Sequence, residues 1–176
     1  MCLLPAQASI ALDPTGLAKY GRGMSTQSPR LAARAVLIVD NRLLLVNAYP
    51  DHDSDLWCAP GGGVERGASL TDNLIREVYE ETGLTVSVGA PCLVNEFHDP
   101  ATGFHQVEVF FRCKLVAGQV NGDWQDAGRV VTRRRWATRA DMAKLRFKPD
   151  SLADVAFRER AFGYDPLEVI VPASAG

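Results

Sequence analysis

Residues 61–84, GGGVERGASLTDNLIREVYEETGL, constrain the fold most, because a glycine-rich loop runs directly into a short segment rich in acids. Ser69 is a suitable helix N-cap, and Asp72 stands three residues later, where a capping-box acid bonds back to the N–H of the cap. Gly83 can end the helix, because a residue without Cβ readily adopts the left-handed conformation after the last turn. The apolar side chains between these residues recur every four positions, at Leu70, Leu74 and Val78. The segment is therefore predicted to be a helix with one side packed on a core.

Three acids of this predicted helix share one surface, because Glu77 precedes both Glu80 and Glu81 by about one turn. Arg76 can reach Glu80 at i+4, but one cation cannot neutralise three anions. Clustered carboxylate oxygens with too few cations suit Mg²⁺ or Mn²⁺. A solvated acidic face is the alternative for such a charge run. The preceding glycine loop favours the metal site, because its peptide groups can approach a ligand or a metal closely.

The same stretch resembles the Nudix box, which has a glycine, five residues, a glutamate, seven residues and then Arg-Glu-apolar-x-Glu-Glu-x-Gly-apolar. The chain matches eight of these nine fixed positions, with Gly62, Arg76, Glu77, Val78, Glu80, Glu81, Gly83 and Leu84. The remaining position, the first glutamate of the box, is occupied by Ala68. In the family this glutamate supports the arginine or orders a metal-bound water, so its loss is expected to lower metal affinity or rate.

The resemblance implies an α/β protein with the Nudix-type α/β/α sandwich and a mixed β-sheet. It also implies a nucleotide pyrophosphatase that hydrolyses phosphoric anhydride bonds with Mg²⁺ or Mn²⁺ as cofactor. The residues that the resemblance places at the metal are Glu77, Glu80, Glu81 and the carbonyl of Gly62. Arg76 would orient the glutamates, and the loop of Gly61, Gly62 and Gly63 would bind substrate.

An extra acid in the loop before a later strand, residues 130–137, is also implied by the resemblance, because family members often carry one that faces the metal. Asp126 and Asp123 are both candidates, and we select Asp126 as a catalytic residue. Glu108 and His105 are rival candidates for a general base. The sequence leaves the identity of the base open.

Composition restricts the class of protein. At 176 residues with 47% hydrophobic content, the chain is long enough for one domain with a core. The net charge of −2 gives no general attraction to nucleic acids, so we expect no stable nucleic-acid complex. No apolar run approaches the ~20 residues that span a bilayer, so we expect no membrane association. The four cysteines form no CxxC pair, which favours reduced thiols in a cytoplasmic protein.

Three segments are predicted along the chain: a flexible N-terminal arm at 1–29, a Nudix hydrolase domain at 30–164 and a C-terminal tail at 165–176. The arm holds three prolines and no periodic pattern, and Met24 is a hypothetical alternative start. In the domain, Asp40-Asn41 joins two apolar runs as a hairpin turn. Residues 106–116 alternate as a strand with its odd-numbered side in the core, and Phe110 indicates partial cover of the other side. Two helices are expected at 138–145 and 151–162.

The sequence thus predicts a metal-dependent hydrolase of a nucleoside diphosphate linked to another moiety, of the NDP-sugar, ADP-ribose or NTP class. The alternative is a catalytically weak Nudix-fold protein that binds a nucleotide as a sensor or interaction partner, and Ala68 is its support. The intact acidic cluster favours the enzyme. A homodimer is common among relatives and is left open.

Overall fold

The computed structural model describes residues 28–49, 54–158 and 160–170. Its elements, in chain order, are β1 (Arg30–Val39), β2 (Arg42–Asn47), β3 (Trp57–Cys58), β4 (Gly61–Gly63), α1 (Leu70–Thr82), β5 (Thr85–Asp99), β6 (Phe104–Ala117), β7 (Arg134–Ala137), α2 (Arg139–Met142), α3 (Leu152–Ala156) and β8 (Gly163–Val169). The first strand of the described part, β1, begins at Arg30. Residues 1–27 of the predicted flexible arm lie outside the described part. Among the residues that the structure describes, no helix is long and apolar enough to cross a membrane.

The described strands form one mixed sheet in the order β3-β2-β1-β6-β5-β8, with β4 paired to β1 and β7 paired to β2. The pairs β1–β6 and β5–β8 are parallel, and the other pairs are antiparallel. The β1–β2 hairpin turns at Asp40 and Asn41, whose φ angles of 47° and 57° are left-handed, as a two-residue hairpin turn requires. The predicted mixed sheet and its first hairpin are confirmed.

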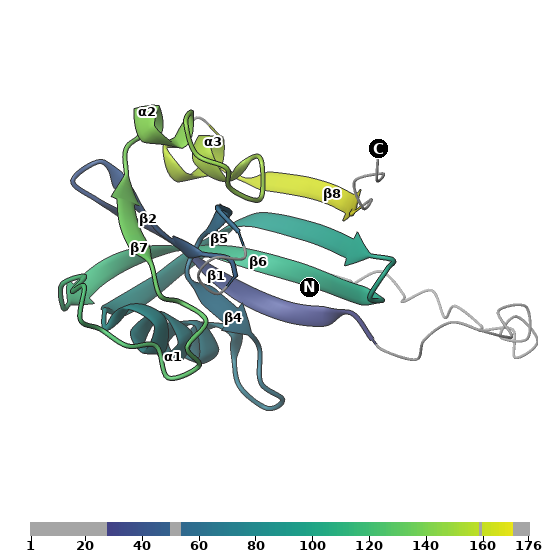
Figure 1. Cartoon of the computed structure of the whole chain (residues 1–176), viewed down its shortest axis with the longest axis horizontal. Coiled ribbons are helices and arrows are strands. Elements are labelled where there is room, and N and C mark those ends of the chain that lie inside the picture. The colour runs from purple at the N-terminus through teal and green to yellow at the C-terminus, as the bar shows by residue number, and fades with distance from the viewer. Residues whose placement is uncertain (1–27, 50–53, 159, 171–176) are drawn as a thin grey trace, which may run out of the picture.

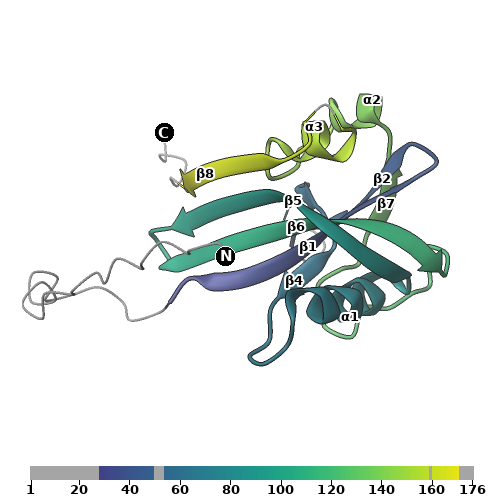
Figure 2. The ribbon, with the colours of Figure 1, turned by 180° about the vertical axis from the view of Figure 1, so that it is seen from behind.

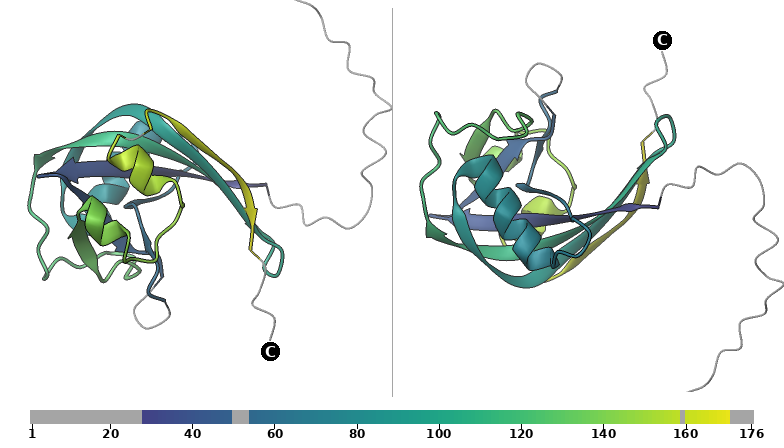
Figure 3. Two further views of the ribbon diagram at one scale, coloured as in Figure 1. Left: turned by 90° about the horizontal axis from the view of Figure 1, so that it is seen from above. Right: turned by 90° about the horizontal axis from the view of Figure 1, so that it is seen from below.

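The helices cover both faces of the sheet, which confirms the α/β/α sandwich (Figures 1 and 2). Helix α1 lies on one face, and α2 and α3 lie on the other, as the views from above and below show (Figure 3). Strand β6 contributes to both cores, because Phe111 and Cys113 pack in the cluster of α1 while Phe110 packs in the cluster of α3. The predicted cover of the Phe110 side is therefore confirmed.

Helix α1 begins and ends where its capping residues predict. The Ser69 hydroxyl accepts the N–H of Asp72 at 3.0 Å, and Gly83 closes the last turn at a φ of 72°. The Asp72 carboxylate differs from the expectation, because it accepts the Ser69 hydroxyl at 2.7 Å in place of the cap N–H. Leu74 and Val78 are fully buried against the sheet, so the predicted apolar stripe fixes the side that α1 presents to the core.

Three expectations for the C-terminal third are corrected. Residues 130–133 are not strand, because the side chains of Asp126 and Asn47 bind four successive backbone N–H groups there and β7 begins only at Arg134. The helices expected at 138–145 and 151–162 are both shorter in the structure, where they are α2 and α3. Residues 163–169, which we placed across the end of the domain and the start of a tail, form the edge strand β8 beside β5. Residues 171–176 of the expected tail lie outside the described part.

Candidate functional site

The glycine loop lies between β1 and the acidic side of α1. Strand β4 pairs with β1 through Gly61 and Gly62, and the Gly61 N–H donates to Glu81 Oε2 at 2.8 Å. A Cβ on Gly61 would lie 2.2 Å from the Ala33 carbonyl, and Gly61 has a φ of 131°. A Cβ on Gly62 would lie 2.3 Å from Glu77 Oε2. Both glycines are therefore needed for the close approach of this loop to the two glutamates.

Arg76 holds the exposed side of the acidic cluster. Its guanidinium donates to Glu80 Oε2 at 2.7 Å and to Glu77 Oε1 at 2.8 Å, and Asn73 Oδ1 accepts at 3.0 Å. Glu65 adds a third carboxylate at 3.2 Å. The hydrogen bond to Glu80 is the largest of the effects that raise the pKa of Arg76. The sequence did not single out Glu65, which stands three residues before Ala68 and supplies Arg76 with an acid from the same loop.

Glu81 is a largely buried acid of the cluster, and its pKa rises from the ordinary 4.5 to about 7. Burial is the main cause, because it disfavours the ionised carboxylate. Arg34 and the Gly61 N–H oppose the rise. The charges of Glu77 and Asp126 add to it. Glu81 can therefore hold or release a proton near neutral pH.

Arg34 connects the loop to a buried polar network that the sequence did not reveal. Its Nε donates to Glu108 Oε1 at 2.8 Å, and its Nη1 donates to the Gly61 carbonyl. Glu108 also accepts from Gln106 at 2.9 Å and from Asn95 at 3.1 Å. The Glu108 carboxylate thus orders the loop through Arg34. The role of Arg34 could not be predicted from the sequence, because a single cation inside an apolar strand belongs to no recognisable motif.

The other rivals for a base differ in their surroundings. Asp126 is 8% exposed, and its carboxylate accepts the N–H groups of Gly128, Val130 and Val131 at 2.9–3.1 Å. The charge of Asp126 contributes to the raised pKa of Glu81, whereas its oxygens bind backbone N–H groups of its own loop. Asp123 is exposed. His105 has a buried Nε2 without a hydrogen-bond partner in the described part of the chain, and its ring lies beside that of His98 at a tilt of 48°, with ring centroids 5.4 Å apart.

Two side chains from the last third of the chain fix the C-terminal end of α1. Trp124 Nε1 donates to the Glu80 carbonyl at 2.9 Å, and Arg134 Nε donates to the Glu81 carbonyl. A Cβ on Gly83 would lie 2.8 Å from the Trp124 ring. The loop after β6 is therefore anchored directly over the acidic turn.

The α1 carboxylates and the Gly62 carbonyl are oxygen donors of the type that binds divalent cations. In this structure they do not surround a common point. Within the described residues, no three His, Cys, Asp or Glu side chains lie close enough together to be a metal cluster. Glu77 packs against the bare Cα of Gly62, and Glu81 carries the raised pKa that an added cation would lower. Glu80 is directed to Arg76. Carboxylate and carbonyl oxygens at one loop–helix junction are the donors that Mg²⁺ prefers.

The comparisons of this chain with known proteins agree on one family. The family model described as NUDIX domain matches residues 28–156. The putative ADP-ribose pyrophosphatase YjhB of Bacillus subtilis is 30% identical over 95 residues, which are 52% of this chain and 44% of that protein. Diphosphoinositol polyphosphate phosphohydrolase 3-alpha of Mus musculus is 29% identical over 135 residues, 76% of this chain and 71% of that protein. A NUDIX hydrolase structure from Nitrosomonas europaea has a TM-score of 0.62 at 22% identity, covering 79% of this chain and 94% of that one.

Proposed function

The chain belongs to the Nudix family, and from that premise we propose that it hydrolyses the pyrophosphate linkage of a nucleoside diphosphate joined to another moiety. One observation carries the proposal: the glycine loop brings the backbone of Gly61 and Gly62 against Glu81 and Glu77 of α1. The names of the relatives, a pyrophosphatase and phosphohydrolases, support the same reaction.

We assign Mg²⁺ or Mn²⁺ to Glu77, Glu80, Glu81 and the Gly62 carbonyl. When bound, the cation supplies a Lewis acid for the diphosphate oxygens and acidifies the attacking water. Binding requires Glu80 to turn from Arg76, because the two side chains are hydrogen-bonded at 2.7 Å. The support for this assignment is the position of Glu77 and Glu81 against the glycine loop, together with the pKa of Glu81, which burial raises and which a bound cation would lower.

The chain's own groups have separate roles in this proposal. Arg76 positions Glu77 and Glu80 through its paired hydrogen bonds. Glu81 takes the proton of the attacking water at Oε1, because Oε2 already accepts the Gly61 N–H. Asp126, our candidate from the sequence, orders the loop after β6 and adds negative charge beside Glu81. Water attacks one phosphorus in line, the bond from that phosphorus to the bridging oxygen breaks, and the other phosphate leaves with its own substituent.

The substrate class rests on the relatives. YjhB is named for ADP-ribose, which contains two nucleoside-linked phosphates, and this name agrees with the class proposed from the sequence. The mouse relative is named for diphosphoinositol polyphosphates and matches a larger share of the chain, which makes that class the second candidate. Both classes share a pyrophosphate linkage, so the same acids of α1 can act on either. We also propose a cytoplasmic location, which cell fractionation tests; light scattering decides between a monomer and the homodimer that the sequence left open.

Ala68 favours an alternative, a Nudix-fold protein that binds nucleotides and turns over slowly. Glu65 weakens this alternative, because its carboxylate lies 3.2 Å from Arg76 and supplies an acid partner in the absence of the box glutamate. The variant Ala68→Glu separates the two functions. A strong rise in hydrolysis identifies a weakened enzyme, whereas continued lack of turnover with intact nucleotide binding supports the sensor.

The proposal is tested by Glu77→Gln and Glu80→Gln, assayed for Mg²⁺-dependent release of nucleoside monophosphate. Each substitution keeps the shape of the side chain and removes its charge, so we expect loss of about 100-fold or more in turnover with retained fold. Glu96→Gln is the matched control, because Glu96 lies on β5 and bonds to Tyr164 at 2.7 Å. Full activity in either α1 variant would contradict the assignment.

A further inference from the structure

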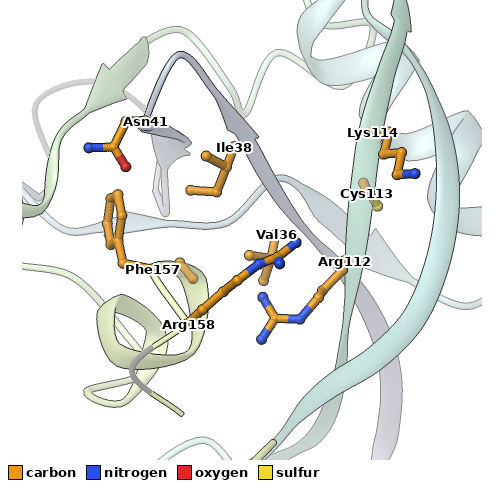
Figure 4. Close-up of a pocket in the computed structure, with 9 residues that line it drawn as sticks. Val36, Ile38, Asn41, Arg112, Cys113, Lys114, Phe157 and Arg158 are labelled. Atoms are coloured by element: carbon orange, nitrogen blue, oxygen red, sulfur yellow. The ribbon is translucent and has the colours of Figure 1, made fainter. Parts of the chain in front are cut away.

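A cavity of about 360 Å³ lies on the side of the sheet opposite to α1 (Figure 4). It is bounded by the β1–β2 hairpin, by β6 and by the end of α3. Val36 and Ala156 in its wall belong to the core cluster of α2 and α3. The acids of α1 belong to the other side, so the proposed hydrolytic site leaves this cavity without a role.

Three cations line the cavity, and no Asp or Glu of the described chain does: the cations are Arg112, Lys114 and Arg158. Within residues 28–49, 54–158 and 160–170, none of the three forms an ion pair. Arg112 and Arg158 extend toward each other beside Val36, and Lys114 lies farther along β6 (Figure 4). Arg112 Nη2 donates to the Arg160 and Ala161 carbonyls at 3.4 and 3.2 Å, which leaves its other N–H groups for a ligand. Two guanidinium groups that face one another repel, and an anion between them removes the repulsion.

The backbone at Arg158 adds a second observation. Arg158 follows α3 with a φ of 64°, the left-handed conformation that glycine adopts at little cost at the end of a helix. A residue with a side chain is strained at such a position, whereas glycine is not. The chain nevertheless places a guanidinium there, directed into the cavity (Figure 4).

The other end of the cavity is apolar. Ile38 and Phe157 lie there with the side-chain amide of Asn41, on the side away from the two arginines (Figure 4). The cavity thus has a cationic end and an apolar end with one amide. Its volume lies within the range of about 300–1,000 Å³ that small-molecule sites occupy.

We propose that this cavity binds an organic phosphate of nucleotide size, with the phosphate between Arg112 and Arg158 and the aromatic body against Ile38 and Phe157. Guanidinium groups bind phosphate oxygens in pairs of charge-assisted hydrogen bonds. Asn41 can donate to and accept from polar atoms of the body. The proposal goes beyond the hydrolytic function and does not require it, because none of these residues lies on the glycine loop or on α1.

The test is isothermal titration calorimetry with adenosine monophosphate in the presence of chelator, which keeps divalent cations from the α1 acids. Arg158→Gly removes one guanidinium and leaves a residue suited to the left-handed backbone. The matched control is Arg129→Gly, because Arg129 is also exposed and has a φ of 54°. We expect both glycine variants to melt at or above the wild-type temperature. Only Arg158→Gly should weaken binding, by about tenfold or more.

A second variant and two fragments complete the test. Lys114→Gln, which leaves the backbone conformation unchanged, should weaken binding by several-fold and make it less sensitive to salt. Adenosine and inorganic phosphate should each bind far more weakly than the monophosphate. Glu81→Gln should bind the monophosphate as the wild type does, which separates this cavity from the hydrolytic site. Undetectable binding to the wild type, equal binding by Arg158→Gly, or loss of binding in Glu81→Gln would overturn the proposal.

Discussion

Replacing Glu81 with Gln should stabilise the metal-free protein at alkaline pH. The pKa of Glu81 is raised from 4.5 in an ordinary environment to about 7 in the fold, mainly by burial. The folded chain therefore binds this proton more tightly than the unfolded chain does. Glu81 costs the fold nothing below pH 4.5, costs more as the pH rises from 4.5 to 7, and costs its full amount above pH 7.

The size of this cost follows from the two pKa values. At about 1.4 kcal/mol for each pH unit between them, ionised Glu81 destabilises the fold by about 3 kcal/mol. Glutamine is neutral at every pH, and its carbonyl oxygen can still accept the Gly61 N–H that Glu81 now accepts at 2.8 Å. The variant should therefore exceed the wild type by about 3 kcal/mol at pH 8. Most of this advantage should disappear at pH 5.

The assay is urea unfolding at pH 5 and pH 8 with chelator present, followed by tryptophan fluorescence. Glu168→Gln, on the edge strand β8, reports the ordinary effect of removing one half-exposed carboxylate. A Glu81→Gln protein that is no more stable than the wild type at pH 8 would refute the reasoning. So would an advantage of equal size at both pH values, because the cost would then not come from ionisation.

Three further substitutions test the contacts around the glycine loop. Gly62→Ala should reduce turnover at least about tenfold while the protein remains folded, because its Cβ would meet the Glu77 carboxylate at 2.3 Å; kinetics and circular dichroism measure the two effects, and unchanged turnover would contradict the close approach. Glu108→Gln should destabilise the fold by about 3 kcal/mol in urea unfolding, because the buried Arg34 charge loses its carboxylate partner. A loss of unfolding free energy below about 0.5 kcal/mol would show that the network is dispensable for stability. Glu65→Ala should lower kcat several-fold and leave Tm within a few degrees, because a 68% exposed acid stabilises little by itself; an unchanged kcat would show that Arg76 needs no third acid.

The sequence predicted the parts of the site that are local in the chain. The caps of α1, its buried stripe and the pairing of Arg76 with Glu80 depend on residues within four positions of one another, so their spacing was sufficient. The first hairpin was predictable for the same reason, from Asp40-Asn41 between two apolar runs.

Long-range partners could not be predicted. Arg34 meets Glu108 across 74 positions, and Arg134 meets Glu81 across 53, so no local pattern marks either contact. The run 130–133 was assigned to a strand because its propensity fits one, whereas its N–H groups bind Asn47, 85 positions away, and the nearby Asp126. Strand β8 was missed because its pairing with β5 decides its structure and much of its surface stays exposed.

The measurement that tests the central claim most directly is product release from a panel of ADP-ribose, NDP-sugars, dinucleoside polyphosphates, NTPs and a diphosphoinositol polyphosphate. Each compound is incubated with Mg²⁺ or Mn²⁺, and again with chelator. We predict cleavage of one class at its pyrophosphate linkage, abolished by chelator and by Glu80→Gln. Absence of cleavage across the whole panel, with metal binding confirmed by calorimetry, would contradict the account and identify the chain as a nucleotide-binding protein.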